Sequence, residues 1–419
     1  MAKSKRWDPH NLSDEGWRAI RDDLETHFQI VPIRERDLIF GRHEQIDKLK
    51  EAARLAGRHA VVYGERGVGK SSIGNTFHLF MENEKRKIQH VRVQAGPTDS
   101  YSDIWMKVFK RISTESGNGN VTTIAEKYRG RTIEPDDVIL EFEDFVAHQL
   151  PIIVIDEFDQ VADKQTRALV SNTIKGLYDT SSQATIVCIG VAETVSDLIE
   201  AHDSIRRAIA QVEMPRMGNR DIRDIIQKGI TRAGFYIAAR ALQRIAFIAK
   251  GIPYYANLLS LNAARAGCDQ RTSVVELSHV ETGIGYAVSD MGQTVLDGYY
   301  KAVTSNTKDT LFSEVLLACA LADREAFGLF NAKEVAVQLH RITGIRYEAP
   351  QFSYHLSEFC HEKRGAILER LGKTRYFKYR FREALMEPFV IAQSIRTNVV
   401  SEKALATIIP QQIPDLFST

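Results

Sequence analysis

Short apolar runs alternate with amphipathic segments over the first half of the chain. The runs are rich in β-branched residues, as expected of parallel strands that are buried on both faces of a sheet. Between them, apolar residues recur at helical spacing, as at residues 101–112. The pattern predicts an α/β fold with a five-stranded parallel sheet and helices on both faces. The predicted strands are residues 59–63, 88–94, 152–155, 185–190 and 211–214.

The pattern changes after residue 216, where the strand-like runs stop. Helical spacing with a glycine or proline near each junction predicts a helical domain. Farther on, further helices precede two strand-like runs joined through Gly372 and Lys373, an order typical of a winged-helix module. The predicted helices are residues 221–233, 238–250, 253–266, 311–321 and 332–339, and the hairpin strands are residues 366–371 and 375–381.

Composition narrows the classes of protein that fit. The 419 residues suffice for more than one core, and the net charge of +1 gives no overall footprint for nucleic acid. No apolar stretch approaches the roughly 20 residues that span a membrane. The basic N-terminus continues into Asp8 and Pro9 instead of an apolar signal segment. The four cysteines are far apart, so we expect free thiols, a cytoplasmic location and no membrane partner.

A phosphate-binding loop is predicted directly after the first strand. Residues 64–71 read GERGVGKS and match the pattern G-x-x-x-x-G-K-[ST], with a helix predicted to begin at Lys70. Glycines let the backbone N–H groups of the loop converge on phosphate oxygens, and a helix N-terminus favours negative charge. We expect Lys70 to bridge the β- and γ-phosphates and Ser71 to coordinate Mg²⁺.

Two acids end the third predicted strand. Asp156 and Glu157 follow a buried apolar run about 85 residues after the loop. Carboxylates beside an apolar strand are costly unless they hold a cation or take part in chemistry. We expect Asp156 to hold Mg²⁺ through water and Glu157 to act as the general base toward the attacking water. Gln94, at the end of the second strand, is a candidate partner for Glu157.

These motifs resemble AAA+ P-loop ATPases, and more closely the origin-recognition or initiator-like and STAND-like branch. Residues 40–44 (FGRHE) are similar to the box that precedes the phosphate loop and borders the adenine in that branch. The resemblance covers residues 37–295 and implies ATP as ligand, Mg²⁺ as cofactor and ATP hydrolysis as activity. The nucleotide-binding residues that it implies are Gly41, Arg42, Gly64, Glu65, Arg66, Gly67, Val68, Gly69, Lys70, Ser71, Ser72, Glu193 and Pro253.

Other parts of such an ATPase are matched less fully. The resemblance places a polar sensor near Glu193, which fits the start of a helix equally well. Arg206 and Arg207 stand where the family carries a catalytic arginine that reaches a neighbouring subunit, or they form an exposed basic helix end. Pro253 begins the second sensor helix, but Tyr254 replaces the arginine that usually follows. Hydrolysis is therefore expected to be slow.

The C-terminal hairpin carries a basic and aromatic stretch at residues 361–382. Its lysines and arginines are spaced to contact the phosphates of double-stranded DNA. Period-two alternation also predicts a plain amphipathic strand, with Phe377, Tyr379 and Phe381 in the core. Both interpretations stay open at this point.

The sequence pattern and the resemblance together divide the chain into five parts and leave two functions open. The first is an AAA+ ATPase that self-associates as a homo-oligomer and engages DNA or a partner protein through its winged helix. The second is a STAND-like signalling switch with slow turnover and a protein-binding C-terminal domain. The expected parts are an N-terminal arm (1–36), a nucleotide-binding core (37–217), a helical lid (218–300), a winged-helix domain (301–398) and a C-terminal tail (399–419).

Overall fold

The chain forms two compact units, and each is described by itself. Unit 1 comprises Met1–Ile30 and Arg216–Thr419, and unit 2 comprises Val31–Pro215. The computed structural model describes residues 12–28, 30, 32–81, 84–115, 121–143, 149–192, 194–199, 203–289, 292–305, 310–372 and 376–409. Glu193 therefore lies outside the described residues, as do Lys373 and Arg375 of the predicted hairpin.

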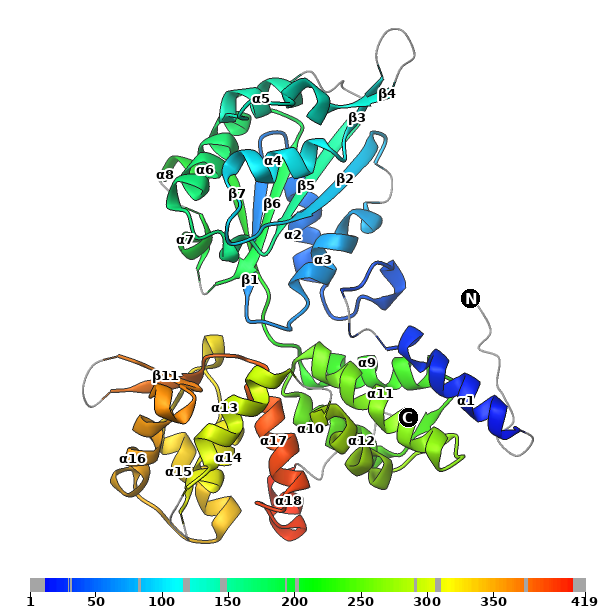
Figure 1. The fold of residues 1–419 in the computed structure, drawn as a ribbon, viewed down its shortest axis with the longest axis vertical. Coiled ribbons are helices and arrows are strands. Elements are labelled where there is room, and N and C mark those ends of the chain that lie inside the picture. The colour runs from blue at the N-terminus through cyan, green and yellow to red at the C-terminus, as the bar shows by residue number, and fades with distance from the viewer. Residues whose placement is uncertain are drawn as a thin grey trace, which may run out of the picture. The chain divides into compact units, whose positions relative to one another are not determined.

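A five-stranded sheet forms the centre of unit 2 (Figure 1). All of its neighbouring strands are parallel, and their order is β2-β5-β6-β1-β7. The strands coincide with the predicted apolar runs, which confirms the predicted α/β fold class. They are β1 (His59–Gly64), β2 (Lys87–Gln94), β5 (Gln149–Asp156), β6 (Thr185–Val191) and β7 (Ile209–Glu213).

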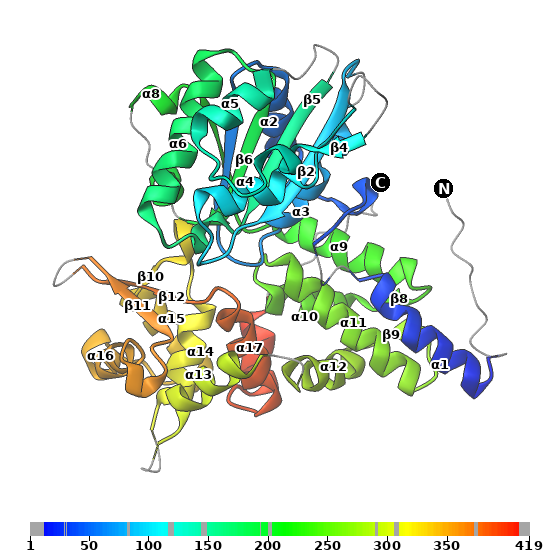
Figure 2. The same ribbon diagram turned by 45° about the horizontal axis from the view of Figure 1, so that its top comes forward.

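Successive strand residues point to opposite faces of this sheet and enter two separate cores. On one face, residues such as Val61 and Ile153 pack with α4 (Tyr101–Phe109), α5 (Pro135–Glu143) and α6 (Lys164–Asp179). On the other face, Val62 and Val154 pack with α2 (His43–Arg54) and α3 (Lys70–Thr76). Figure 2 shows the two helical layers from a second direction. This alternation is the reason why the strands read as continuous apolar runs.

Smaller elements complete unit 2. A hairpin of β3 (Ser113–Glu115) and β4 (Val121–Thr123) extends beyond α4, and no sequence pattern had indicated it. The short helices α7 (Val195–Leu198) and α8 (Asp203–Arg206) lie between β6 and β7. The 3-10 turns are η3 (Arg36–Leu38), η4 (Phe77–Phe80), η5 (Ile124–Tyr128) and η6 (Phe158–Gln160).

Helices dominate unit 1. The predicted helices after residue 216 are confirmed as α9 (Asn219–Arg232), α10 (Ala239–Ala249) and α11 (Pro253–Asp269), followed by α12 (Leu277–Ser289). The N-terminal α1 (Asp14–Asp23) begins at the side-chain cap of Ser13 and packs on α11. Short strands β8 (Tyr236–Ile237) and β9 (Val274–Val275) and the turn η2 (Leu24–Thr26) complete this part.

The C-terminal part of unit 1 combines helices with a three-stranded sheet. The predicted hairpin is present as β11 (Leu368–Leu371) and β12 (Lys378–Phe381), and β10 (Phe330–Asn331) adds an unforeseen third strand. The turns are η7 (Ala326–Gly328) and η8 (Glu362–Arg364). The helices are α13 (Gln293–Val303), α14 (Phe312–Leu321), α15 (Ala332–Thr343), α16 (Ala349–Glu358), α17 (Met386–Arg396) and α18 (Glu402–Ile408).

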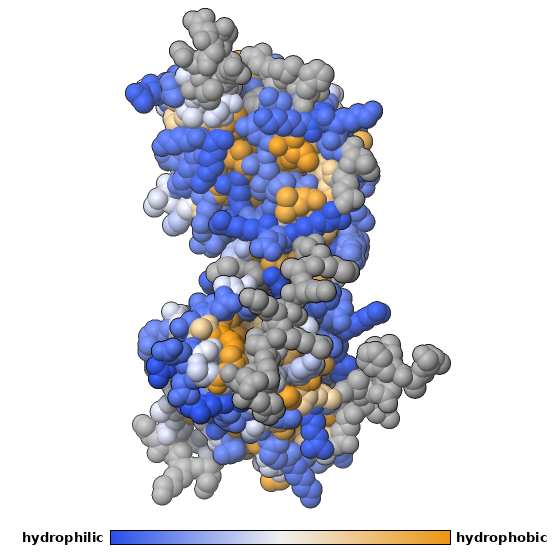
Figure 3. Space-filling view, turned by 90° about the vertical axis from the view of Figure 1, so that its right-hand side faces the viewer, coloured by the Kyte–Doolittle hydropathy of each residue, from blue (hydrophilic) through white to orange (hydrophobic). Residues whose placement is uncertain are grey.

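The helices of the described residues are too short or too polar to cross a bilayer. On the face seen in Figure 3, hydrophobic residues lie in separate areas among hydrophilic ones. Scattered apolar residues of this kind are normal on a protein surface.

Candidate functional site

The carboxyl ends of the central strands bring the predicted site residues to one edge of the sheet in unit 2. Since the strands are parallel, Gln94, Asp156, Val191 and Gly64 all end at that edge. Gln94 and Asp156 are direct register partners on neighbouring strands. Ligands of open parallel sheets bind outside such carboxyl ends.

The phosphate loop follows β1 in a backbone conformation that requires glycine. Gly64, Gly67 and Gly69 have φ angles of 146°, 82° and 98°, which side chains with a Cβ rarely adopt. A Cβ on Gly64 would lie 2.5 Å from the carbonyl oxygen of Met214. Around Gly69, in contrast, a Cβ would meet open space, so this part of the loop can admit a ligand.

Lys70 begins α3, as predicted, and its ammonium group is directed into the loop. Its Nζ donates to the carbonyl oxygens of Gly64 at 2.9 Å and Glu65 at 2.7 Å. Burial lowers the pKa of Lys70 to about 8, although the charges of Asp159 and Asp156 act in the opposite direction. A buried cation that is held by two carbonyl oxygens is strongly stabilised when an anion binds nearby.

Arg42 supports the phosphate loop from behind. Its Nη2 donates to the carbonyl oxygens of Val68 and Pro215, each at 2.8 Å, and the side chain is buried. Gly41 precedes it with a φ of 61°. Arg42 thereby ties the loop to the end of β7, while its contact with a nucleotide stays a prediction.

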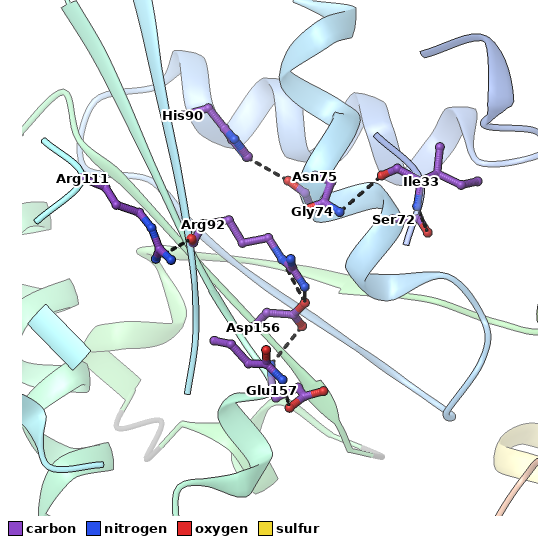
Figure 4. A network of polar contacts seen from close by, with 10 residues as sticks. Ile33, Ser72, Gly74, Asn75, His90, Arg92, Arg111, Asp156 and Glu157 are labelled. Carbon is purple, nitrogen blue, oxygen red and sulfur yellow. Dashed lines mark hydrogen bonds and ion pairs between the residues drawn. The ribbon is translucent and has the colours of Figure 1, made fainter. Parts of the chain in front are cut away.

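The start of α3 also holds the N-terminal segment of unit 2. The backbone N–H of Ile33 donates to Ser72 Oγ at 3.1 Å, and Asn75 Nδ2 donates to the carbonyl oxygen of Ile33 at 3.2 Å. Figure 4 shows both contacts beside the strands. Ser72 thus has a protein partner in this structure, whereas Ser71 is half-buried at the loop.

Asp156 and Glu157 occupy different environments although they are adjacent. Asp156 is 2% exposed, and its Oδ1 accepts the backbone N–H of Glu157 at 2.9 Å. Glu157 is exposed and has a φ of 55°, which is uncommon for a residue other than glycine. Its carboxylate accepts a hydrogen bond from Gln94 Nε2 at 2.5 Å. This contact confirms Gln94 as the partner of Glu157.

Three polar side chains of β2 form a row, which we call the β2 polar row: His90, Arg92 and Gln94. They alternate with the buried Val91 and Val93 and therefore share the α3 face of the sheet. His90 Nε2 lies 2.9 Å from the carbonyl oxygen of Gly74, and Arg92 contacts Asp156 through Nε at 3.1 Å and through Nη2 (Figure 4). Arg92 was not among the predicted site residues, although its place two residues before Gln94 puts both side chains on the same face of the strand.

Asp159 is a second residue of this edge that was not among the predicted site residues. Its Oδ1 accepts the backbone N–H of Val191 at 3.0 Å, at the end of β6. Its charge opposes the lowering of the Lys70 pKa. Asp159 thus helps to fix the backbone at this edge of the sheet. In the sequence it could have been recognised as a third acid that closely follows Asp156 and Glu157.

Arg206 and Arg207 are exposed at the opposite edge of the sheet. They directly precede β7, and Arg58 at the amino end of β1 donates to the carbonyl oxygen of Arg207. Since β1 and β7 are parallel, these arginines lie at the amino edge, whereas the phosphate loop lies at the carboxyl edge.

Pro253 and Tyr254 belong to unit 1, where Pro253 is the first residue of α11. The ring of Tyr254 meets that of Tyr255 edge to face, with 5.6 Å between centroids. The roles of both residues at a nucleotide stay predictions.

Unit 1 contains a cavity of about 410 Å³ whose lining includes Arg216, Lys250 and Arg324. The same three cations surround the fully buried Glu387 of α17, with N–O distances of 2.8, 3.8 and 3.3 Å. Because a carboxylate of the protein already engages these cations, the loop in unit 2 is the better candidate for binding phosphate.

The basic hairpin in unit 1 pairs much of its positive charge with acidic side chains. Lys378 pairs with Glu325 at 2.5 Å and Arg380 with Glu369 at 2.7 Å, while Arg364 lies over the ring of Phe312. Tyr379 and Phe381 are buried, as the alternation predicted. The described part of the hairpin therefore supports the amphipathic interpretation more than an exposed basic surface.

The residues at the carboxyl edge fit a nucleoside triphosphate with Mg²⁺. The loop offers open space at Gly69, Lys70 offers a buried positive charge, and Ser71 and Asp156 are oxygen donors of the kind that Mg²⁺ prefers. Glu157 is exposed next to them. The arrangement can bind phosphate, hold a metal and position a water molecule.

Comparisons with known proteins agree with this geometry. The family model described as Novel STAND NTPase 1 matches residues 28–312. The ORC2 protein of Aeropyrum pernix, solved as ADPNP-ADP complexes, has a TM-score of 0.50 at 12% identity. The match covers 94% of this chain and 97% of the ORC2 chain. The Walker-type ATPase paby2304 of Pyrococcus abyssi has a TM-score of 0.50 at 16% identity, with coverage of 88% and 99%. None of the curated proteins matches in sequence.

At these identities the two structures show a shared fold alone. Together with the family match, they confirm the resemblance to AAA+ P-loop ATPases of the origin-recognition-like and STAND-like branch.

Proposed function

The chain belongs to the Novel STAND NTPase 1 family, and from that premise we propose that it is a nucleotide switch. In this proposal unit 2 binds ATP with Mg²⁺ and hydrolyses it slowly. The observation that carries the proposal is the meeting of two motifs at one sheet edge. The glycine-rich loop with the buried Lys70 ends β1, and the pair Asp156–Glu157 ends β5 of the same parallel sheet.

Each group at this edge has a distinct role in the proposal. The N–H groups of residues 65–71 bind phosphate oxygens, and Lys70 balances the charge of the β- and γ-phosphates. Ser71 and Asp156 hold Mg²⁺, which when bound neutralises negative charge on the phosphates. Glu157 accepts a proton from the attacking water as general base.

Slow turnover is proposed for two reasons. The hydrogen bond from Gln94 keeps the Glu157 carboxylate occupied until that contact is released. Tyr254, which follows Pro253 at the start of α11, supplies no guanidinium for the transition state. Both features are more typical of a switch that retains its nucleotide than of an enzyme with high turnover.

We propose that Arg206 or Arg207 completes the site of a second copy of the chain. The strands between the two sheet edges are five to eight residues long, which corresponds to roughly 17–27 Å. An arginine at the amino edge is therefore too far from the phosphate loop of its own sheet. A homo-oligomer would bring the arginine of one subunit to the γ-phosphate of another.

We propose that residues 301–398 are a winged-helix module that binds a partner protein. Lys378 and Arg380 are each neutralised by an acidic side chain, which favours a protein partner over DNA. The test is binding of the full chain to a 30-base-pair duplex at low salt. No binding is expected, and tight binding with a salt slope that falls in Lys378→Glu would establish DNA as the partner.

The decisive experiment for the nucleotide site is calorimetry of ATP binding with Mg²⁺ to the wild-type chain and to Lys70→Ala. We expect affinity to fall about 10- to 100-fold, the weight of charge-assisted contacts to phosphate. Lys48→Ala is the matched control, because Lys48 pairs with Glu44 on the exposed face of α2. Equal affinity in Lys70→Ala, or no binding by the wild type, would overturn the proposal.

A further inference from the structure

Asp156 has little capacity left for another cation in the observed arrangement. An ionised carboxylate has about four sites for accepting hydrogen bonds. The Glu157 N–H takes one site on Oδ1, and the Nε and Nη2 groups of Arg92 take two on Oδ2. A hydrated metal ion that approaches this carboxylate therefore meets a guanidinium already in place.

We propose that Arg92 is a positioning residue that competes with Mg²⁺ for Asp156. Loading of the metal requires Arg92 to release at least one of its two contacts. This inference rests on the proposed function, because it assumes that Asp156 serves Mg²⁺ when the nucleotide binds. In this inference, Arg92 sets the Mg²⁺ concentration that nucleotide binding requires.

The two partners differ in their freedom to move. Asp156 is 2% exposed in the last position of a central strand, so its carboxylate is fixed. The side chain of Arg92 is 28% exposed, so its guanidinium can turn toward water. The backbone of Arg92 stays in place, because Arg111 Nη1 donates to its carbonyl oxygen at 2.8 Å and the neighbouring Val91 and Val93 are buried.

The exchange keeps the charge of Asp156 balanced throughout. A buried carboxylate that loses its cation is strongly destabilised, so one cation leaves as the other arrives. Binding of Mg²⁺ and release of Arg92 are then linked, and each weakens the other by the same factor. Removal of Arg92 should therefore lower the Mg²⁺ concentration that nucleotide binding requires.

The test is the affinity of the full chain for AMP-PNP, measured over a range of MgCl₂ concentrations. In Arg92→Gln we expect the Mg²⁺ concentration at half-maximal affinity to fall about tenfold, the equilibrium weight of one charge-assisted hydrogen bond. Arg92→Lys keeps the charge but offers a single point of contact, so its midpoint should lie between the two.

Two control variants separate competition from a general effect. Arg131→Gln removes another arginine–aspartate ion pair of unit 2, that of Arg131 with Asp137, and should leave the midpoint unchanged. In the background of Asp156→Asn, Arg92→Gln should have no further effect on the midpoint, because the contested carboxylate is gone. Thermal unfolding with MgCl₂ alone gives a second readout, with a larger stabilisation in Arg92→Gln than in the wild type.

A midpoint that is unchanged or higher in Arg92→Gln overturns the inference and leaves the proposed nucleotide site intact. The same holds if Arg92→Lys behaves like Arg92→Gln and both match the wild type. If the wild type binds no AMP-PNP at any Mg²⁺ concentration, the proposed function fails and the inference fails with it.

Discussion

Two buried carboxylates, one in each unit, differ in the charged groups that surround them. Glu387 in the first turn of α17 is completely buried and lies within 3.8 Å of three cations from separate segments of unit 1. Within the described part of the chain, Asp156 at the end of β5 contacts one arginine and one backbone N–H. Both acids are shielded from water, but they differ in the number and freedom of their partners.

This difference distinguishes a structural ion cluster from the proposed site of cation exchange. Around Glu387 the cations come from residues 216, 250 and 324, so the cluster joins three parts of unit 1 and is fixed by all of them. Arg92, the side chain that contacts Asp156, is partly exposed, and Asp156 ends its strand at the sheet edge of the candidate phosphate loop. We therefore expect changes at Glu387 to affect stability and changes near Asp156 to affect ligands.

The largest expected effect is on stability. Glu387→Gln leaves three cations without their carboxylate and should lower the free energy of unfolding by about 3–5 kcal/mol in urea titrations. Glu402→Gln is the matched control, because Glu402 pairs with Arg244 but is largely exposed, and it should cost less than about 1 kcal/mol. Equal costs for the two variants would remove the structural role of Glu387.

The second effect is on turnover. Glu157→Gln removes the proposed general base and should slow ATP hydrolysis at least about 100-fold, with little change in melting temperature because Glu157 is exposed. Glu51→Gln on the exposed face of α2 is a control that should keep wild-type turnover. Unchanged turnover in Glu157→Gln would show that another group activates the water.

A smaller effect is expected at Asp156 itself. Asp156→Asn should weaken the Mg²⁺-dependent part of ATP affinity about tenfold. Its stability loss should be below that of Glu387→Gln, since the partly exposed Arg92 can turn to water. Calorimetry with MgCl₂ or EDTA and urea unfolding measure the two quantities. A stability loss as large as that of Glu387→Gln, without loss of affinity, would show that Asp156 is structural like Glu387 and does not serve the ligand.

The smallest effect concerns pH. Burial raises the pKa of Glu387, but the charges of Arg324, Arg216 and Lys250 together lower it below its usual value of 4.5. The unfolded chain therefore takes up this proton first, and the stability that Glu387 contributes is complete above about pH 4.5 and lost as the pH falls through the folded pKa. The stability gap between wild type and Glu387→Gln should stay constant from about pH 7 to 5 and shrink below. A gap that shrinks near pH 6 would contradict this.

The sequence predicted the sheet, and it located the candidate phosphate site, because both depend on local patterns. Buried parallel strands read as apolar runs, and the loop at residues 64–71 carries its chemistry in consecutive positions. The contact of Gln94 with Glu157 was also accessible, since both end predicted strands.

The remaining features depend on partners that are distant in sequence. The three cations around Glu387 come from positions up to 171 residues away, and no spacing rule connects them. Arg271 and Arg265 pair with Asp14 and Glu25 across more than 200 residues, which places α1 on the helices of unit 1. Arg92 reads as an ordinary strand residue until the register of β2 and β5 brings it to Asp156.

Hydrogen exchange of the full chain with and without Mg²⁺ and AMP-PNP tests most directly whether ATP binds at the loop of unit 2. We expect slower exchange of the backbone amides at residues 65–72, because their N–H groups would bind phosphate. Amides of α17 around Glu387 should exchange at the same rate in both conditions. Unchanged exchange at the loop, with saturating nucleotide, would contradict the account.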